Sequence, residues 1–185
     1  MSHVLVTGFE PFATHAVNPS AVVAEALGRS PGFEAHVLPV VYDGVMARLE
    51  PLLARGPRAV VLLGVHNGPE VRLERVARNA ITADTPDNHG VVPPKRSIVA
   101  GAPDRYASTL PLEAMCDALS RAGVGVTLSD DAGGYLCNYV FYAARHWFES
   151  RGERTPCGFV HVPTFDHLDE AAQVEALRSS LKTLG

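Results

Sequence analysis

A cysteine at the entrance of an expected helix is the residue of this sequence best suited to chemistry. The segment 129–137 leaves a predicted strand, turns on Gly133 and Gly134, and places Cys137 in the first turn of the helix. A helix N-terminus presents unpaired N–H groups and the positive end of the helix dipole, so a thiol there ionises more readily. Because the thiolate is the nucleophilic form, Cys137 is a candidate catalytic nucleophile.

A histidine near the end of the next expected strand is a candidate base for this thiol. The stretch 158–163 is typical of a strand and has His161 near its carboxyl end, where sites of α/β sheets lie. A right-handed crossover through the intervening helix favours placing the two strands side by side. We therefore expect Cys137 and His161 to approach each other, although a lone cysteine and a lone histidine each have a purely structural interpretation.

A Cys–His pair works best with a third group that holds the imidazole in one tautomer. Three carboxylates are candidates for that group: Glu74, Asp87 and Asp166. For Glu74, spacing alone favours an ion pair with a neighbouring arginine at the surface over an orienting role, since such pairs are common.

The elements that must position these side chains alternate between strand and helix. This order predicts a layered α/β domain with a mostly parallel sheet, and the length of 185 residues predicts one domain, 1–185. The expected strands are 3–7, 34–41, 58–64, 124–128 and 158–163, and the expected helices are 18–28, 43–55, 109–122, 135–150 and 169–184.

Two loops and one irregular segment complete the expected site. Phe9 and Phe12 follow the first strand and either fill the core or wall an apolar pocket. The stretch 71–81 reads as one extended segment whose alternation breaks in the middle. The stretch 84–107 is rich in proline, glycine and aspartate, and we expect it to form a lid or rim over the site, with room for a short hairpin.

Composition excludes several classes of protein. The net charge of −4 and the absence of a basic run argue against binding to nucleic acid or to an anionic membrane. Three cysteines without paired spacing argue against disulfides and, with no signal peptide, favour a reduced, cytoplasmic protein. No histidine or cysteine spacing is typical of a metal site and no nucleotide-binding motif is present, so we expect no metal and no cofactor.

Several stretches together resemble one family of cysteine peptidases, pyroglutamyl peptidase I, also called pyrrolidone-carboxylate peptidase. They occur in the family's order over nearly the whole chain, which makes the resemblance specific. The stretches are VLVTGFEPF (4–12), NPS (18–20), LERVA (73–77), PDN (86–88), GAP (101–103), STLP (108–111), SDDAGGYLCNY (129–139) and FVHVP (159–163).

The resemblance implies hydrolysis of an N-terminal pyroglutamyl residue from peptides on a three-layer α/β/α sandwich with a mostly parallel twisted sheet. It implies that Cys137 is the nucleophile, that His161 is the general base and then acid, and that Glu74 orients His161. The residues that it implies for substrate binding are Phe9, Phe12, Asn18, Val65, His66 and Asn67.

The resemblance also implies a homo-oligomer, a tetramer or a dimer.

One position keeps a second hypothesis about function open. The family often has an arginine near the oxyanion, and Asp84 stands at that position here. Because a carboxylate cannot donate to an oxyanion, the alternative is a pyroglutamate-binding or weakly active homologue, unless Arg72, Arg78 or backbone amides take over.

Overall fold

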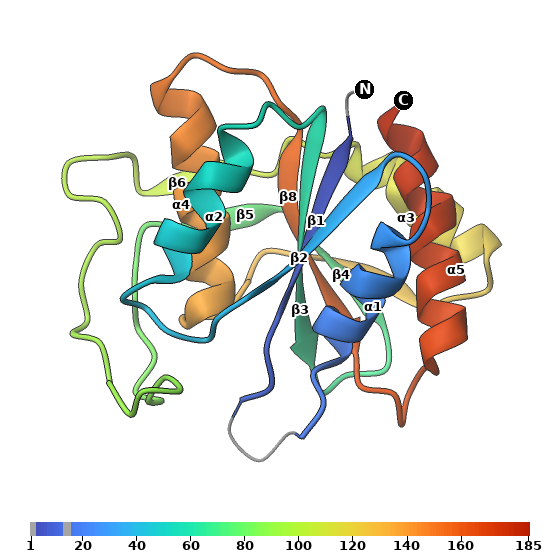
Figure 1. Cartoon of the computed structure of the whole chain (residues 1–185), viewed down its shortest axis with the longest axis horizontal. Coiled ribbons are helices and arrows are strands. Elements are labelled where there is room, and N and C mark those ends of the chain that lie inside the picture. Colours follow the sequence, from blue (N-terminus) through green and yellow to red (C-terminus); the bar gives the residue numbers. More distant parts are fainter. Residues whose placement is uncertain (1–2, 13–15) are drawn as a thin grey trace.

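A six-stranded sheet runs through the middle of the molecule, with helices on both faces (Figure 1). The structure is a computed structural model, and it describes residues 3–12 and 16–185. Along the sheet the strand order is β2-β1-β3-β8-β4-β7. The elements are β1 (Val4–Phe9), α1 (Pro19–Gly28), β2 (Phe33–Leu38), α2 (Val45–Leu53), β3 (Ala59–His66), β4 (Val71–Glu74), β5 (Val76–Arg78), β6 (Arg105–Ala107), α3 (Leu112–Arg121), β7 (Val126–Ser129), α4 (Leu136–Ser150), β8 (Cys157–Pro163), α5 (Glu170–Leu181) and the 3-10 turn η1 (Lys182–Leu184).

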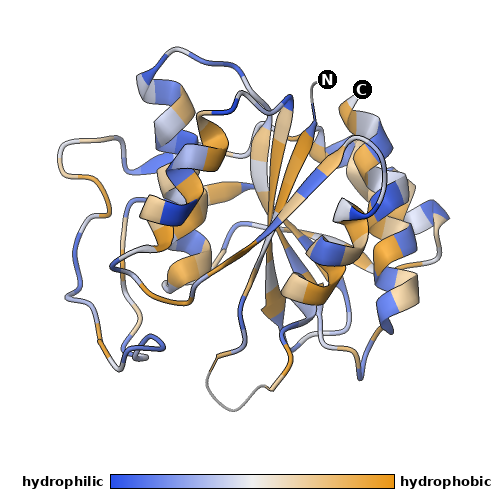
Figure 2. Ribbon diagram, in the orientation of Figure 1, coloured by the Kyte–Doolittle hydropathy of each residue, from blue (hydrophilic) through white to orange (hydrophobic). Residues whose placement is uncertain are grey.

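The helices divide into two layers, each with its own apolar core against the sheet. Helices α1, α3 and α5 cover one face, and α2 and α4 cover the other (Figure 1). Hydrophobic residues predominate in the central strands and on the sides of the helices that face them (Figure 2), because strands covered on both faces are largely buried. The expected three-layer α/β/α sandwich with a mostly parallel sheet is therefore confirmed.

The centre of the sheet differs from the expectation in one respect. Strands β7 and β8 are not neighbours, since β4 lies between them, parallel to β7 and antiparallel to β8. The expectation that the crossover through α4 would join adjacent strands was wrong, because a short strand from earlier in the chain occupies the gap.

The segment after β4 also differs from the expectation. The stretch 71–81 is not one extended segment but two strands that separate at Arg75, and β5 leaves the main sheet to pair with β6. In the described chain, the loop between β5 and β6 contains no hairpin. Its one β-bridge joins Ile81 to Arg96, and both backbone and side-chain hydrogen bonds attach this loop to the rest of the molecule.

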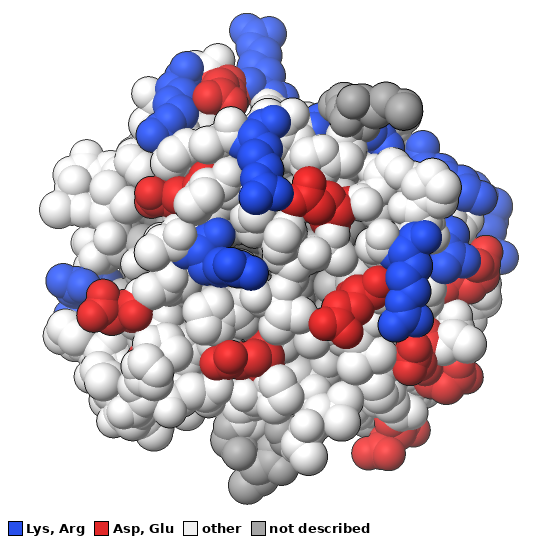
Figure 3. Space-filling model, in the orientation of Figure 1, with Lys and Arg blue, Asp and Glu red and all other residues white. Residues whose placement is uncertain are grey.

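Acidic and basic side chains are interspersed on the face of the molecule that Figure 3 shows. In the part of the chain that the structure describes, no helix is both long and apolar enough to cross a membrane.

The first strand comes unusually close to the first turn of α1. A Cβ atom on Gly8 would lie 2.2 Å from the backbone oxygen of Ser20. The approach lets the Ser20 hydroxyl accept a hydrogen bond from the backbone N–H of Phe9 at 3.0 Å. Glycine at position 8 is therefore needed to bring the loop after β1 against the helix.

We expect Gly8→Ala to lower the free energy of unfolding by about 1–3 kcal/mol, because the new methyl group meets backbone rather than a movable side chain. Chemical denaturation measures the change. Gly125→Ala is the matched control, since a Cβ there first meets the flexible side chain of Glu70 at 3.2 Å, and a change within about 0.5 kcal/mol is expected. Equal stability of the two variants would contradict the close approach at Gly8.

Candidate active site

Cys137 lies in the first turn of α4, with its sulfur against the end of β3. A Cβ atom on Gly64 would stand 2.8 Å from Cys137 Sγ and 2.7 Å from Cζ of Phe159. The thiol thus occupies space that any side chain at position 64 would need. The first backbone bond into the helix comes from Tyr139 N–H to the carbonyl of Tyr135, so the N–H of Cys137 is among those without an intrahelical acceptor.

His161 and Glu74 meet through the antiparallel pairing of β8 with β4. His161 Nδ1 lies 2.8 Å from Glu74 Oε1, the Glu74 side chain is fully buried, and that of His161 is 10 % exposed. Cys137 lies close enough to interact with the side chain of His161 and raises its pKa. The structure therefore brings Cys137, His161 and Glu74 into one line of contacts.

Electrostatics favour a charged imidazole in this line. Burial by itself would lower the pKa of His161, because it removes water from the imidazolium. Interactions with Cys137 and with the Glu74 carboxylate act in the opposite direction and raise the pKa of His161 to about 9. At neutral pH the imidazole of His161 is therefore protonated.

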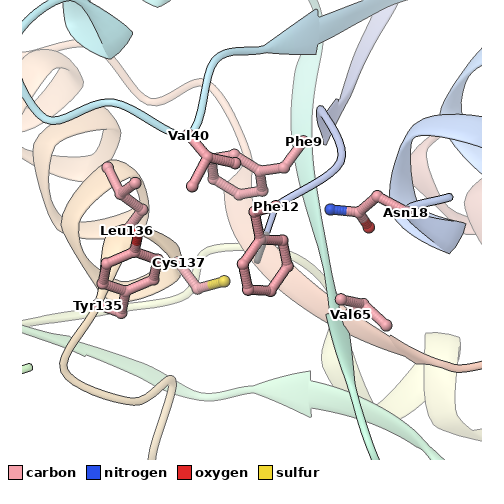
Figure 4. Close-up of a pocket in the computed structure, with 8 residues that line it drawn as sticks. All are labelled: Phe9, Phe12, Asn18, Val40, Val65, Tyr135, Leu136 and Cys137. Carbon is pink, nitrogen blue, oxygen red and sulfur yellow. The ribbon is translucent and has the colours of Figure 1, made fainter. Parts of the chain in front are cut away.

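A small apolar pocket opens beside the sulfur (Figure 4). Its volume is about 270 Å³ when the space that opens to solvent is counted. Four of its residues were expected from the sequence as substrate contacts, namely Phe9, Phe12, Asn18 and Val65. The others are Val40, Tyr135, Leu136 and Cys137. Val40 and Leu136 carry no signal in the sequence beyond being apolar, so sequence reasoning had no means of selecting them.

The structure places the other two expected substrate contacts elsewhere. The ring of His66 packs edge-on against His161, with centroids 6.0 Å apart, and its Nδ1 accepts a hydrogen bond from Gly68 N–H. Asn67 is exposed, and its carbonyl contacts the ring of His167 at 3.1 Å. Neither side chain is among those that line the pocket.

Asn18 joins two parts of the pocket. Its side-chain oxygen accepts hydrogen bonds from Ser20 N–H at 3.1 Å and from the Ser20 hydroxyl at 2.8 Å, and this caps α1. Its side-chain nitrogen donates to the carbonyl of Glu10 at 3.1 Å. The same side chain therefore starts a helix and fixes the loop that carries Phe9 and Phe12.

Three residues of the long loop after β5, Pro86 to Asn88, connect the two sides of the pocket by hydrogen bonds, and we call this segment the staple. The Asn88 side chain donates to Glu10 Oε1 and to the Pro11 carbonyl, both at 2.9 Å. The hydroxyl of Tyr135 donates to the Pro86 carbonyl at 3.0 Å. The expected rim is thus a set of bonds that ties the phenylalanine loop to the entrance of α4. Only the turn chemistry of this segment was visible in the sequence.

The remaining candidate carboxylates have other partners. Asp87 accepts hydrogen bonds from the backbone N–H groups of Tyr42, His89 and Val91, and Asp166 is exposed. Among the residues that the structure describes, no group of three histidine, cysteine or acidic side chains is arranged to hold a metal ion.

Asp84, the residue at the position where an arginine was expected, is directed to solvent. Its carboxylate is 78 % exposed and pairs with Lys95 at 3.0 Å. Arg78 pairs with Asp131 at 3.3 Å and donates to the Asp130 carbonyl at 3.0 Å. Neither Asp84 nor Arg78 is therefore free to donate at Cys137, whereas the first turn of α4 places backbone N–H groups without intrahelical acceptors at that residue.

Known proteins resemble this chain over almost all of its length. The family model for pyroglutamyl peptidase matches residues 2–176. A pyrrolidone-carboxylate peptidase of Thermococcus onnurineus is 39 % identical over 190 residues, which cover 97 % of this chain and 93 % of that protein. A pyrrolidone-carboxylate peptidase of Deinococcus radiodurans is 41 % identical over 171 residues, covering 88 % and 78 % of the two chains.

Solved structures agree with the sequence comparison. The pyrrolidone carboxyl peptidase of Thermococcus litoralis superposes with a TM-score of 0.92 at 32 % identity, covering 99 % of this chain and 93 % of that one. A mutant pyrrolidone carboxyl peptidase of Pyrococcus furiosus gives a TM-score of 0.91 at 34 % identity, covering 98 % and 97 %. With its fold, its sequence and the family model all in agreement, the chain belongs to the pyroglutamyl peptidase family.

Proposed function

We propose that this protein is a cysteine peptidase that removes an N-terminal pyroglutamyl residue from peptides. The observation that carries the proposal is the line from buried Glu74 through His161 to Cys137, which ends at the mouth of a small apolar pocket. Membership of the family supports the substrate class. In this proposal Cys137 is the nucleophile, His161 the general base and acid, and Glu74 the group that orients His161.

The reaction follows from the protonation of the pair. The Cys137 thiolate attacks the pyroglutamyl carbonyl carbon, and the N–H of Cys137 donates to the oxyanion that forms. His161 gives its proton to the leaving amine as the C–N bond breaks, which leaves a thioester on Cys137. Water then attacks the thioester while His161 takes a proton, and pyroglutamate leaves as the thiolate is restored. His161 ends the cycle protonated.

The pocket suits the acyl group of such a substrate. A pyroglutamyl ring is a neutral five-membered lactam, which favours an apolar slot with few polar contacts. Phe9 and Phe12 supply apolar walls, Val65 lies at the end of β3, and Asn18 is a polar side chain in the lining. We propose that backbone groups near His66 and Asn67 reach the lactam, since their side chains do not line the pocket.

The wider setting of the enzyme is also a proposal. We infer a single catalytic domain over 1–185, supported by one main sheet that draws strands from Val4 to Pro163. A homo-oligomer, a dimer or a tetramer, is supported by the exposed apolar side chains of Val91 and Val92 on the long loop. A cytoplasmic location is supported by three free cysteines.

A second candidate function is a pyroglutamate-binding protein with weak turnover. The observation that favours it is Asp84, whose exposed carboxylate pairs with Lys95 and supplies no donor to the site. Such a protein would be stabilised thermally by pyroglutamate and would hydrolyse a pyroglutamyl amide no faster than the background reaction.

We expect the wild-type protein to hydrolyse a pyroglutamyl amide with a chromogenic leaving group, and Cys137→Ala to reduce turnover to background, because it removes the one thiol among the described residues that line the pocket. Cys116→Ala is the matched control, since Cys116 lies half-buried among the residues packed against the opposite core. A thermal shift with pyroglutamate in the absence of wild-type turnover would favour the binding protein. Full activity of Cys137→Ala would exclude the proposed mechanism.

We expect the kcat/KM of the wild type to fall as the pH rises through about 9, because His161 then loses the proton that the leaving amine receives. Glu74→Gln should move this limb to lower pH, because it removes a carboxylate that raises the pKa of His161 in the wild type. The same substitution should lower kcat by roughly 10²–10⁴-fold. A pH–rate profile measures both effects. Glu70→Gln, an exposed glutamate on the preceding loop, is the control, and an unchanged limb in Glu74→Gln would refute the assigned role.

We expect Asn88→Ala to raise KM for the pyroglutamyl amide by about fivefold or more and to lower kcat less, because it removes two hydrogen bonds that hold the loop of Phe9 and Phe12. Steady-state kinetics separate the two constants. Ser97→Ala, an exposed change in the same long loop, should leave both unchanged. A loss in kcat alone would show that the staple acts on Cys137 and not on the pocket.

A further inference from the structure

Arg72 carries an uncompensated charge beside the proposed active site. It stands directly opposite His161 in the pairing of β4 with β8, two residues before Glu74. Directly opposed residues project to the same face of a sheet, and Val71 and Leu73 belong to the core on the other face. Arg72 therefore projects to the face on which His161 and Cys137 meet.

The Arg72 guanidinium lies at the open edge of that face. A Cβ atom on Gly68 would be 3.6 Å from one of its terminal nitrogens and 2.7 Å from Cε1 of His66. His66 in turn contacts the ring of His161. The guanidinium, the His66 ring and the imidazole of His161 therefore form a continuous rim, which we call the Arg72 rim.

No acidic group neutralises this charge. Arg72 makes no hydrogen bond or ion pair through its side chain with any residue in 3–12 or 16–185, and it is exposed. Glu74 is committed to His161, and the side chain of Glu70 is directed towards Gly125. Burial, together with the charge of Arg72, lowers the pKa of His66, so His66 is neutral at pH 7.

The order of strands tells which part of a substrate reaches this rim. The apolar pocket lies at the ends of β1 and β3, the sulfur lies over Gly64 of β3, His161 is on β8, and Arg72 is on β4. If the pocket holds the acyl group, the amine that His161 protonates leaves on the side of β4. The peptide beyond the cleaved bond then extends along the Arg72 rim.

We propose that Arg72 selects substrates with a carboxylate just beyond the cleaved bond. This inference rests on the proposed function and names a substrate class within it. The carboxylate has two sources: an acidic side chain on the residue after pyroglutamate, or the free C-terminus of a pyroglutamyl dipeptide. Both present the same group to a guanidinium, which pairs well with carboxylates through its fork of N–H donors.

The test compares kcat/KM within two matched pairs of peptides. One pair is pyroglutamyl-Asp-Ala-amide and pyroglutamyl-Asn-Ala-amide, which differ in the side-chain charge. The other is pyroglutamyl-Ala and pyroglutamyl-Ala-amide, which differ in the terminal charge. We expect the wild type to favour the charged member of at least one pair by about two- to fivefold at low salt, as for an exposed ion pair, and less at high salt. The favoured pair identifies the source.

The variants assign the preference to Arg72. In the favoured pair, Arg72→Gln should bring the ratio of kcat/KM for the charged peptide to kcat/KM for the neutral peptide to about one. Arg72→Glu should make this ratio smaller than one. Arg121→Gln, a change at an exposed arginine of α3 on the other face of the sheet, should keep the wild-type ratio.

Three results would overturn the inference. The first is a ratio of one in both pairs, and the second is a ratio that survives in Arg72→Gln. The third is a fall in the kcat/KM of Arg72→Gln that is equal for charged and neutral peptides, which would indicate that Arg72 has a structural role. Absence of turnover with all four peptides would overturn the proposed function and the inference together, whereas equal turnover within both pairs would overturn the inference alone.

Discussion

The contact between Glu74 and His161 is the interaction on which the rest of the site depends. A carboxylate with 0 % exposure and a histidine with 10 % exposure are expensive to bury separately, because each charge leaves water. At 2.8 Å they offset each other's desolvation and set the position of the imidazole. This requires β4 to pair antiparallel with β8, so the boundary between the four parallel strands and the oppositely directed β4 and β7 is the structural basis of the site.

Close packing at two glycines completes the geometry. At Gly64 the sheet leaves room for the sulfur of Cys137, and at Gly8 the first strand meets the backbone of α1. Both glycines follow long apolar runs in buried strands. At each of them the missing side chain lets two elements approach more closely than strand and helix layers usually do.

The sequence predicted the layers and most of the site because those features depend on local pattern. The alternation of apolar strands with capped helices predicted the sandwich, and the turn at Gly133 and Gly134 predicted a cysteine at a helix entrance. The insertion of β4 between β7 and β8 was not predicted, since the pairing of strands distant in sequence leaves no local mark. For the same reason spacing ranked Glu74 as a surface charge, and only the family resemblance pointed to its contact with His161.

Some of the pocket residues could likewise be predicted from the sequence and others could not. Phe9 and Phe12 stood out because aromatic side chains are unusual in a loop, whereas Val40 and Leu136 are ordinary apolar residues that the fold happens to bring together. Asn88 appeared only as part of a turn, because its bonds to Glu10 and Pro11 span 78 and 77 residues.

Those long spans have a consequence for how the protein acquires its site. Glu74 and His161 are 87 residues apart, and the staple connects the middle of the chain to its first loop. Contacts of such separation form late, after the loop-closure entropy between them has been overcome. A chain that has emerged only as far as α4 possesses the thiol but neither β8 nor its histidine. The contact between Glu74 and His161, and with it the arrangement around Cys137, therefore forms only when the sheet is finished.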